Sequence, residues 1–483
     1  MSAELILRSK ELFARVFQEP ANVIVCAPGR VNLIGEHTDY NEGCVRLCSL
    51  RAPQPPTAAL SAAHMLGVQC VHRVSLTRRD APPPPRSFAM PFCIGKYTVI
   101  AARRRTGATC RITSAGVPGA ISTFPGDSSL SPGPEGDWTN YVRGVVFGML
   151  PMLPGGSCAF DAAVVSDVPL GSGLSSSASL EVATATLLES IYRLGADPKG
   201  KALVCQKAEQ TFCNSPCGIT DQFVCACGEA GHALLIDCRP PYATESVPLS
   251  DRRVALVVAD SNVKPQLSGS EYPDRVQQCK DACAAMQAAG HSEVRHLRDA
   301  TLSMLETVAR SHALPEATVR RARHGISEDQ RTLQAKEALK ACDYAQVGRL
   351  MFASHASLRD DYRVSSPELD ALVEIARGVP GVHGSRLTGG GFGGCTVTLL
   401  SRSAVPALLA AFEAEYPKRA GGRTASVFVV RPAAGAMLLQ QGAGAEPLAG
   451  APLSPQLSGV AKVTAALVLS AVAAAVIASK RQR

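Results

Sequence analysis

The sequence predicts an α+β fold divided into two domains. Its 483 residues are too many for one ordinary hydrophobic core, so two domains with extensions are the default expectation. Hydrophobic residues make up 46% and charged residues 19%, a balance typical of globular proteins rather than disordered ones. Short β-branched runs and longer helical patterns occur in both halves of the chain, which indicates strands and helices in each domain.

Charge and cysteine content exclude several classes of function. The formal net charge of +8 is modest, and its short clusters at Arg103–Arg105 and Arg320–Arg323 contain no interleaved aromatic residues. We interpret them as solvated faces and expect no nucleic-acid partner. The 17 cysteines are scattered and odd in number, and the polar amphipathic pattern of Leu5–Phe17 predicts a helix rather than a signal sequence. Reduced thiols in the cytoplasm are therefore expected, without a zinc site.

A polar stretch, APGRVNLIGEHTDYNEG at Ala27–Gly43, follows a short predicted strand at Val23–Val25. Pro28, Gly29 and Gly35 exclude a helix there, so a loop is expected. Four of its side chains could converge on the hydroxyls of a ligand: Arg30, Glu36, His37 and Asp39. The alternative is a solvated surface turn.

The next segment, Cys44–Ser87, contains Pro53, Pro55, Pro56 and the run Pro82–Pro85, and it has no sustained periodicity. Such a pattern predicts irregular structure. Both a functional insertion and a mispredicted splice junction explain it. Strands are expected next at Phe88–Pro91, Cys93–Ala102 and Thr109–Thr113, and a helix from Trp138 to about Leu150.

The run Val168–Tyr192 predicts a phosphate-binding element. A strand at Phe160–Val165 leads into PLGSGLSSSAS, and a long Ala/Leu helix follows. Small residues let backbone N–H groups close on an anion, and the helix N-terminus adds positive potential. The alternative is an ordinary serine-capped helix start.

A second pair of acidic residues follows this element. Lys201–Thr211 reads as a helix that carries Glu209, and Pro216 and Gly218 then break the chain before Asp221. We expect Asp221 in the first turn of the next helix, where the helix dipole alone could explain a carboxylate.

Farther along, strands are predicted at Ala233–Asp237 and Val254–Val258, with a domain boundary near residue 245. Four helical patterns follow: Arg275–Ala289, Leu302–Ala313, Glu316–Glu328 and Ser354–Tyr362. The glycine-rich run SRLTGGGFGGCTVTLL at Ser385–Leu400 then leads into another strand.

The stretch Ala27–Gly43 resembles the signature of galactokinases, in the superfamily named after galacto-, homoserine, mevalonate and phosphomevalonate kinases. The GLSSSAS loop and the TGGGFGG run are similar to two further motifs of that superfamily. The likeness covers about 390 residues and stops at Pro432. It implies a two-domain sugar kinase with its active site in the cleft between domains, which phosphorylates galactose at the anomeric hydroxyl with ATP and Mg²⁺.

The resemblance also implies roles for individual residues. Asp221 is the expected base and Arg30 the cation that keeps it ionised beside the attacking hydroxyl. The expected sugar contacts are Arg30, Glu36, His37, Asp39, Gly218, Asp221 and Tyr272. The expected ATP contacts are Trp138, Gly171, Gly173, Ser175, Ser176 and Ser177, and Mg²⁺ is assigned to Ser177 and Glu209. Trp138 reads equally well as a buried anchor of its helix. Thr220 departs from the family's usual methionine beside the base.

Two other functions stay open at this point. An N-acetylgalactosamine kinase would differ only in the room around the second carbon of the sugar. The second alternative is a non-catalytic protein that senses galactose by binding it. The intact GLSSSAS loop together with Asp221 favours the enzyme over this sensor.

The predicted domains are residues 1–245, with an insertion at 44–87, and residues 246–432; residues 433–483 are predicted to be a linker and an apolar tail. Within the tail, Val463–Ser479 has no charged residue and would form a helix of about 25 Å, slightly shorter than a ~30 Å hydrocarbon core. A weak membrane anchor and an Ala-rich soluble helix both remain open. We expect a cytoplasmic monomer or weak dimer.

Overall fold

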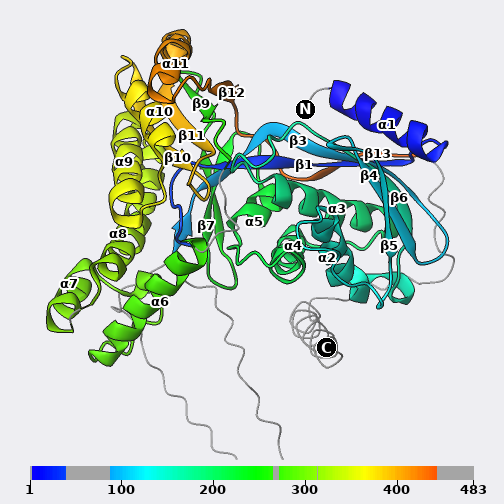
Figure 1. The fold of residues 1–483 in the computed structure, drawn as a ribbon, viewed down its shortest axis with the longest axis horizontal. Coiled ribbons are helices and arrows are strands. Elements are labelled where there is room, and N and C mark those ends of the chain that lie inside the picture. Colours follow the sequence, from blue (N-terminus) through cyan, green and yellow to red (C-terminus); the bar gives the residue numbers. More distant parts are fainter. Residues whose placement is uncertain (1–2, 40–86, 265–270, 313, 443–483) are drawn as a thin grey trace, which may run out of the picture.

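The computed structural model describes residues 3–39, 87–264, 271–312 and 314–442 (Figure 1). It combines three sheets with helices in an α+β arrangement, as predicted. The strands are β1 Val23–Asn32, β2 Phe88–Ala89, β3 Pro91–Arg104, β4 Thr109–Ser114, β5 Val117–Pro125, β6 Phe160–Ser166, β7 His232–Asp237, β8 Thr244–Pro248, β9 Val254–Asp260, β10 Val382–Thr388, β11 Cys395–Ser401, β12 Ser426–Val430 and β13 Met437–Gln441. The helices are α1 Ala3–Phe17, α2 Thr139–Met149, α3 Ser176–Tyr192, α4 Pro198–Phe212, α5 Thr220–Cys227, α6 Glu271–Ala288, α7 Leu302–Ser311, α8 Glu316–Lys340, α9 Tyr344–Ser357, α10 Pro367–Arg377 and α11 Val405–Arg419, and a π-helical turn, Leu358–Tyr362, follows α9.

The first sheet has six strands in the order β13-β1-β3-β6-β4-β5, and both of its faces are covered (Figure 1). Alternate residues of β1 show why, because successive side chains of a strand point to opposite faces. Val23 and Val25 belong to the core shared with α2, α3, α4 and α5, whereas Ile24 and Cys26 pack with Leu5 and the rest of α1. A strand buried on both faces reads as a continuous apolar run, as VIVCA does.

The second sheet has the order β10-β11-β9-β12 and belongs to the C-terminal half of the chain. Leu256 and Val258 of β9 lie in a core with α8 and α9, and Val257 on the opposite face packs with α10 and α11. The third sheet, β2-β7-β8, is small. Val31 and Leu33, at the end of β1, share the core of α8 and α9, so the N-terminal strand reaches into the C-terminal half.

The prediction of a loop from Ala27 is wrong for its first six residues, because β1 continues to Asn32. The register of β1 against β3 shifts between Pro28 and Arg30, a bulge that accommodates the proline. On its other side β1 pairs with β13 only as far as Cys26. Pro28 lies beyond this pairing, so its missing N–H costs no hydrogen bond between β1 and β13. Arg30 is therefore placed by a strand rather than by a loop.

Two further boundaries differ from the sequence predictions. The helix expected to end at Glu328 continues to Lys340 as α8. The prediction of a linker and tail at 433–483 is wrong for Met437–Gln441, since β13 pairs with β1 at the edge of the first sheet. Sequence reasoning missed β13 because its partner lies at the other end of the chain. The predicted domain boundary near residue 245 stays a prediction.

Two predicted segments fall outside the described residues. They are the insertion at 44–87, of which Ser87 alone is described, and the apolar run Val463–Ser479. Among the helices that the structure does describe, none combines the length and the apolar character that crossing a bilayer requires.

A close approach between α9 and β10 joins the layers of the C-terminal half. A β-carbon added to Gly348 of α9 would lie 1.8 Å from the carbonyl oxygen of His383, and one added to Gly384 would lie 2.4 Å from Gly348 Cα. Side chains cannot fit in this contact, which explains glycine inside a helix where alanine is normally better.

We therefore predict that Gly348→Ala destabilises the protein by ~1–3 kcal/mol, the usual cost of overpacking, although alanine has the better helix propensity. Gly200 of α4 is the matched control, because an added β-carbon there meets nothing within 4 Å. Gly200→Ala should leave stability unchanged or raise it by about 0.5–1 kcal/mol. Urea unfolding of both variants measures the difference, and equal midpoints would contradict the packing argument.

Candidate active site

Arg30 and Asp221 form an ion pair that joins β1 to the first turn of α5. Arg30 Nε donates to Asp221 Oδ1 at 2.7 Å and Nη2 donates to Oδ2 at 2.8 Å, a bidentate geometry. Burial lowers the pKa of Arg30, but the negative charges of Asp221 and Glu36 outweigh burial and raise that pKa above its usual value. The Arg30 side chain is 8% exposed and that of Asp221 is 33% exposed. The carboxylate thus has room for a further partner.

The phosphate-loop candidate reaches the same pair. Arg30 Nη1 donates to the carbonyl of Gly173 at 2.6 Å, and Ser175 Oγ donates to Asp221 Oδ2 at 2.6 Å. Ser175 has a left-handed backbone (φ 60°) and its hydroxyl does not cap α3, which begins at Ser176. The ordinary serine cap considered from the sequence is therefore absent at Ser175, and the hydroxyl is turned toward Asp221 instead.

The glycines of this loop and of the TGGGFGG run face each other. Gly171 and Gly173 have positive φ, as do Gly389 and Gly394. A β-carbon on Gly389 would lie 2.7 Å from the Gly173 carbonyl, and one on Gly394 would lie 2.7 Å from the Ser172 carbonyl. This run therefore packs against the phosphate loop, and the closeness explains glycine at both positions.

Behind the loop lie two buried glutamates. Gln222 Nε2 donates to Glu209 Oε2 at 2.6 Å and to Glu181 Oε2 at 3.0 Å, and Ser177 hydrogen-bonds to Glu209. Burial, with repulsion from Asp221, raises the pKa of Glu209 to about 7. Burial and repulsion from Glu209 raise the pKa of Glu181 well above its usual value. The two predicted metal ligands, Ser177 and Glu209, thus lie side by side in an electronegative environment.

This environment suits a divalent cation. Glu181 Oε1 is buried with no hydrogen-bond partner among the described residues. The negative charges of Glu209 and Asp221 disfavour ionisation of Glu181, and that of Asp221 disfavours ionisation of Glu209. A cation would lower this electrostatic cost. The described residues contain no group of three or more His, Cys, Asp and Glu arranged as a complete metal site. Mg²⁺ commonly takes one or two protein carboxylates and completes its shell with phosphate and water, which fits Ser177 and Glu209.

Asp39 lies on the other side of the α5 N-terminus. Its Oδ2 accepts from the backbone N–H of Thr220 at 3.4 Å, and burial raises its pKa. A β-carbon on Gly218 would lie 1.9 Å from Asp39 Oδ2, so only glycine leaves space for this carboxylate. Asp39 and Gly218, two of the expected sugar contacts, are therefore adjacent.

Glu36 and His37 lie deeper, against the C-terminal half. Glu36 accepts from the side chain of Asn32, from the backbone of Gly389 and from a buried arginine, Arg386. Burial, with repulsion from His324 and Arg386, lowers the pKa of His37 to about 3, so its imidazole is neutral. The His37 ring packs on Tyr362, with centroids 4.8 Å apart.

The two remaining candidates are aromatic. Trp138 immediately precedes α2 and is partly buried against the first core, as the anchor alternative expects. Tyr272 lies in the first turn of α6 rather than in a loop.

Sequence reasoning missed four residues of this region: Glu181, Gln222, Glu328 and Arg386. Glu181 had a signal, since it is the one charged residue between Ser176 and Leu188 in an apolar helix. Buried charge in such a run needs a function or a partner.

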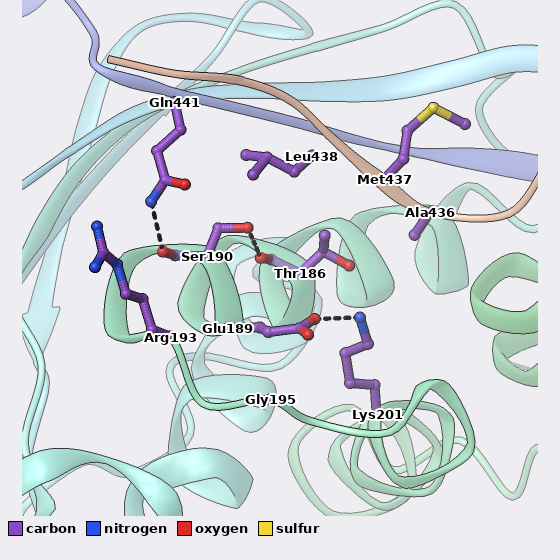
Figure 2. Close-up of a pocket in the computed structure, with 10 residues that line it drawn as sticks. All are labelled: Thr186, Glu189, Ser190, Arg193, Gly195, Lys201, Ala436, Met437, Leu438 and Gln441. Carbon is purple, nitrogen blue, oxygen red and sulfur yellow. Dashed lines mark hydrogen bonds and ion pairs between the residues drawn. The ribbon is translucent and has the colours of Figure 1, made fainter. Parts of the chain in front are cut away.

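A separate hollow of about 450 Å³ lies between the C-terminal end of α3 and β13 (Figure 2). Glu189 and Lys201 form an ion pair in it, and Gln441 Nε2 donates to the Ser190 carbonyl at 3.2 Å. None of the candidate site residues lines this hollow. It is therefore distinct from the centre around Arg30 and Asp221.

The chain is similar to known proteins over most of its length. Family models match at residues 11–52 (galactokinase galactose-binding signature), 140–229 (GHMP kinases N-terminal domain) and 335–418 (GHMP kinases C-terminal). The chain is 42% identical to galactokinase of Homo sapiens over 90% of its length and 97% of that protein. It is 41% identical to galactokinase of Roseiflexus sp. over 87% of its length and 94% of that protein.

Solved structures show the same fold. Lactococcus lactis galactokinase complexed with galactose superposes with a TM-score of 0.75 at 29% identity, covering 91% of this chain and 100% of that one. Methanococcus jannaschii mevalonate kinase, at 15% identity, shares the fold with a TM-score of 0.55 and covers 86% of this chain and 99% of that one.

The buried glutamates generate a pH prediction. Because the pKa of Glu209 is raised by folding, its protonated form stabilises the folded state fully below pH ~4.5, and this contribution is lost as pH rises through about 7. In wild type, this effect should lower the free energy of unfolding by up to ~3 kcal/mol as the pH rises, and Glu209→Gln should abolish that decrease. Urea unfolding in EDTA at pH 5 and pH 8 measures it.

The control for this prediction is Glu413→Gln, at an exposed position of α11. That variant should keep the wild-type difference in stability between pH 5 and pH 8. If Glu209→Gln keeps it as well, folding does not raise the pKa of Glu209.

Proposed function

The chain belongs to the galactokinase family of GHMP kinases, and from this premise we propose that it transfers the γ-phosphoryl group of ATP to the anomeric hydroxyl of α-D-galactose. The products are galactose 1-phosphate and ADP. The observation that carries the proposal is the Asp221 carboxylate, 33% exposed, which is held by Arg30 from β1 and by Ser175 from the phosphate loop. Arg30 lies just before the loop Leu33–Asp39, which we call the sugar loop. Sugar and nucleotide elements thus meet at one carboxylate.

In the proposed mechanism Asp221 accepts the proton of the sugar O1 hydroxyl while O1 attacks the γ-phosphorus. Two of its hydrogen bonds come from the Arg30 fork, which fixes the plane of the carboxylate and leaves lone pairs for the incoming hydroxyl. Arg30 also stabilises the negative charge that develops between O1 and the transferred group. Phosphoryl transfer requires mainly positioning and charge stabilisation, so no covalent enzyme intermediate is needed.

The nucleotide would lie along the phosphate loop. Gly171, Gly173, Ser176 and Ser177 supply backbone and hydroxyl groups near the start of α3, where the helix dipole favours phosphate. Trp138 would lie beside the adenine. Ser177 and Glu209 would hold Mg²⁺, which neutralises charge on the phosphates when bound.

The sugar hydroxyls would be held by Glu36, His37, Asp39, Gly218 and Tyr272. A carboxylate has about four lone-pair directions, and the three donors to Glu36 leave one for a hydroxyl. The imidazole of His37 is neutral, and one of its ring nitrogens is hydrogen-bonded to the backbone of Gly390, so at most the other nitrogen can bond a sugar hydroxyl.

The test is an ATP-dependent phosphorylation assay of the purified protein with galactose, N-acetylgalactosamine and glucose. We expect turnover with galactose and a much lower kcat/KM with the other two. Higher kcat/KM with N-acetylgalactosamine would favour that kinase instead, and galactose binding without turnover would favour the sensor. We further propose that the enzyme acts in the cytoplasm as a monomer or weak dimer.

The catalytic prediction concerns the base. Asp221→Asn should lower kcat by at least ~10²-fold, the usual scale for a positioned base, because an amide cannot accept the proton. Asp161→Asn is a matched control, since Asp161 makes an equally bidentate pair with Arg111 on the first sheet. Initial rates at saturating galactose and ATP compare the two. Near-normal turnover of Asp221→Asn would remove the assignment.

The insertion prediction rests on its flanks. Thr38 Oγ1 donates to the Phe88 carbonyl at 3.1 Å, and Asp329 accepts from Phe88 N at 2.9 Å, so the flanks lie together beside the sugar loop. We expect a deletion that joins Gly43 to Phe88 to lower KM for galactose and to change ATP affinity little. Steady-state kinetics of both forms measure this, and an equal KM would show that the segment does not affect the sugar site.

A further inference from the structure

Arg386 of β10 lies at the centre of a network of charges buried between the sugar loop and the C-terminal helices. Its side chain is 0% exposed. Nη1 donates to Glu36 Oε2 at 3.2 Å and to the Asn32 carbonyl at 3.2 Å, and Nε donates to Ser354 Oγ at 3.1 Å. One guanidinium thus binds the end of β1, the sugar loop and α9.

Glu328 of α8 complements this arginine. Its Oε1 lies 4.0 Å from Arg386 Nη2, accepts from the Gly35 backbone N–H at 3.1 Å and accepts from Ser354. Its Oε2 accepts from Arg331 Nε at 2.6 Å. The backbone just before Glu36 is therefore held by a second residue from the C-terminal half.

A second contact from α8 holds the peptide that follows Glu36. His324 Nε2 lies 3.2 Å from the carbonyl oxygen of Glu36. Burial lowers the pKa of His324 to about 4, so the ring is neutral and adds no charge to the network. Glu36 is thus held through its backbone as well as its side chain.

The balance of charges makes Arg386 necessary. Burial raises the pKa of Glu36, and Glu328 raises it further, whereas Arg386, Arg30 and the Gly389 backbone lower it. Without Arg386, two buried carboxylates would face each other with one cation fewer, and a buried charge without a partner moves or becomes neutral. Either outcome changes what Glu36 can offer a ligand.

We propose that Arg386 and Glu328 are positioning residues, which hold Glu36 and the Gly35–Glu36 backbone in the orientation that binds galactose. The inference deepens the proposed function and rests on it. Within the part of the chain that the structure describes, the hydrogen bonds of Arg386 go to Glu36, Asn32 and Ser354, so its effect should fall on sugar affinity rather than on chemistry or nucleotide affinity.

The experiment compares Arg386→Met, Arg386→Lys and the wild-type full-length protein by calorimetry, with galactose and with a non-hydrolysable ATP analogue. We expect Arg386→Met to weaken galactose binding at least ~10-fold and nucleotide binding less than ~2-fold. Lysine keeps the charge but loses the fork, so Arg386→Lys should restore part of the affinity. In kinetics, KM for galactose should rise with kcat within ~3-fold of wild type.

Arg111→Met is the matched control, because it breaks an arginine–carboxylate pair of the first sheet without touching the sugar loop. It should leave both affinities within ~2-fold of wild type. A double-mutant cycle with Glu36→Gln tests the route of the effect. If Arg386 acts through Glu36, the double variant should lose less binding free energy for galactose than the sum of the losses in the two single variants.

Ser354→Ala keeps the test decisive if Arg386→Met does not fold, since Ser354 bridges Arg386 and Glu328. It should weaken galactose binding ~3-fold. Unchanged galactose affinity in Arg386→Lys and Ser354→Ala overturns the proposal, and so does a parallel loss of galactose and nucleotide affinity. A wild-type protein that binds no galactose overturns the proposed function instead.

Discussion

The paired charge of Arg30 and Asp221 is the interaction on which the site depends. The two residues are 191 positions apart, and their pairing requires that β1, the phosphate loop and α5 meet. A largely buried guanidinium must find acceptors, and here Asp221 and the Gly173 carbonyl supply them. The glycine at 389 leaves this carbonyl its space, because a β-carbon there would lie 2.7 Å from the Gly173 oxygen.

A second set of charges, around Glu36, Glu328 and Arg386, ties the sugar loop to the C-terminal half. Buried pairs of this kind contribute little net stability, but they are costly to break, so they fix relative position more than they strengthen the fold. The two halves of the chain therefore share one electrostatic unit at the loop that follows β1. The hydrophobic core shared by Val31, Leu33 and α9 supports the same junction.

The sequence predicted most strands and helices because periodicity reports on neighbours in the chain. The grouping of Arg30, Asp39 and Gly218 with Asp221 was implied only by the resemblance to galactokinases. It misplaced Arg30 in a loop, since proline and glycine also occur at a bulge. It missed Arg386 and Glu328, because an isolated arginine or glutamate reads as a solvated residue until its distant partner is known. The placement of Ser175 against Asp221 was equally invisible, because a serine cluster before a helix normally indicates capping.

The pairing of β13 with β1 has a consequence for how the polypeptide is made. The two strands are separated by about 400 residues, so the first strand to be synthesised must wait for nearly all the rest of the chain before its outer edge is covered. Unpaired edges recruit other strands, and contacts this far apart form slowly. The nascent N-terminal half is therefore a natural client for chaperones, and a shortened form that ends before Met437 would carry a permanently open, aggregation-prone edge.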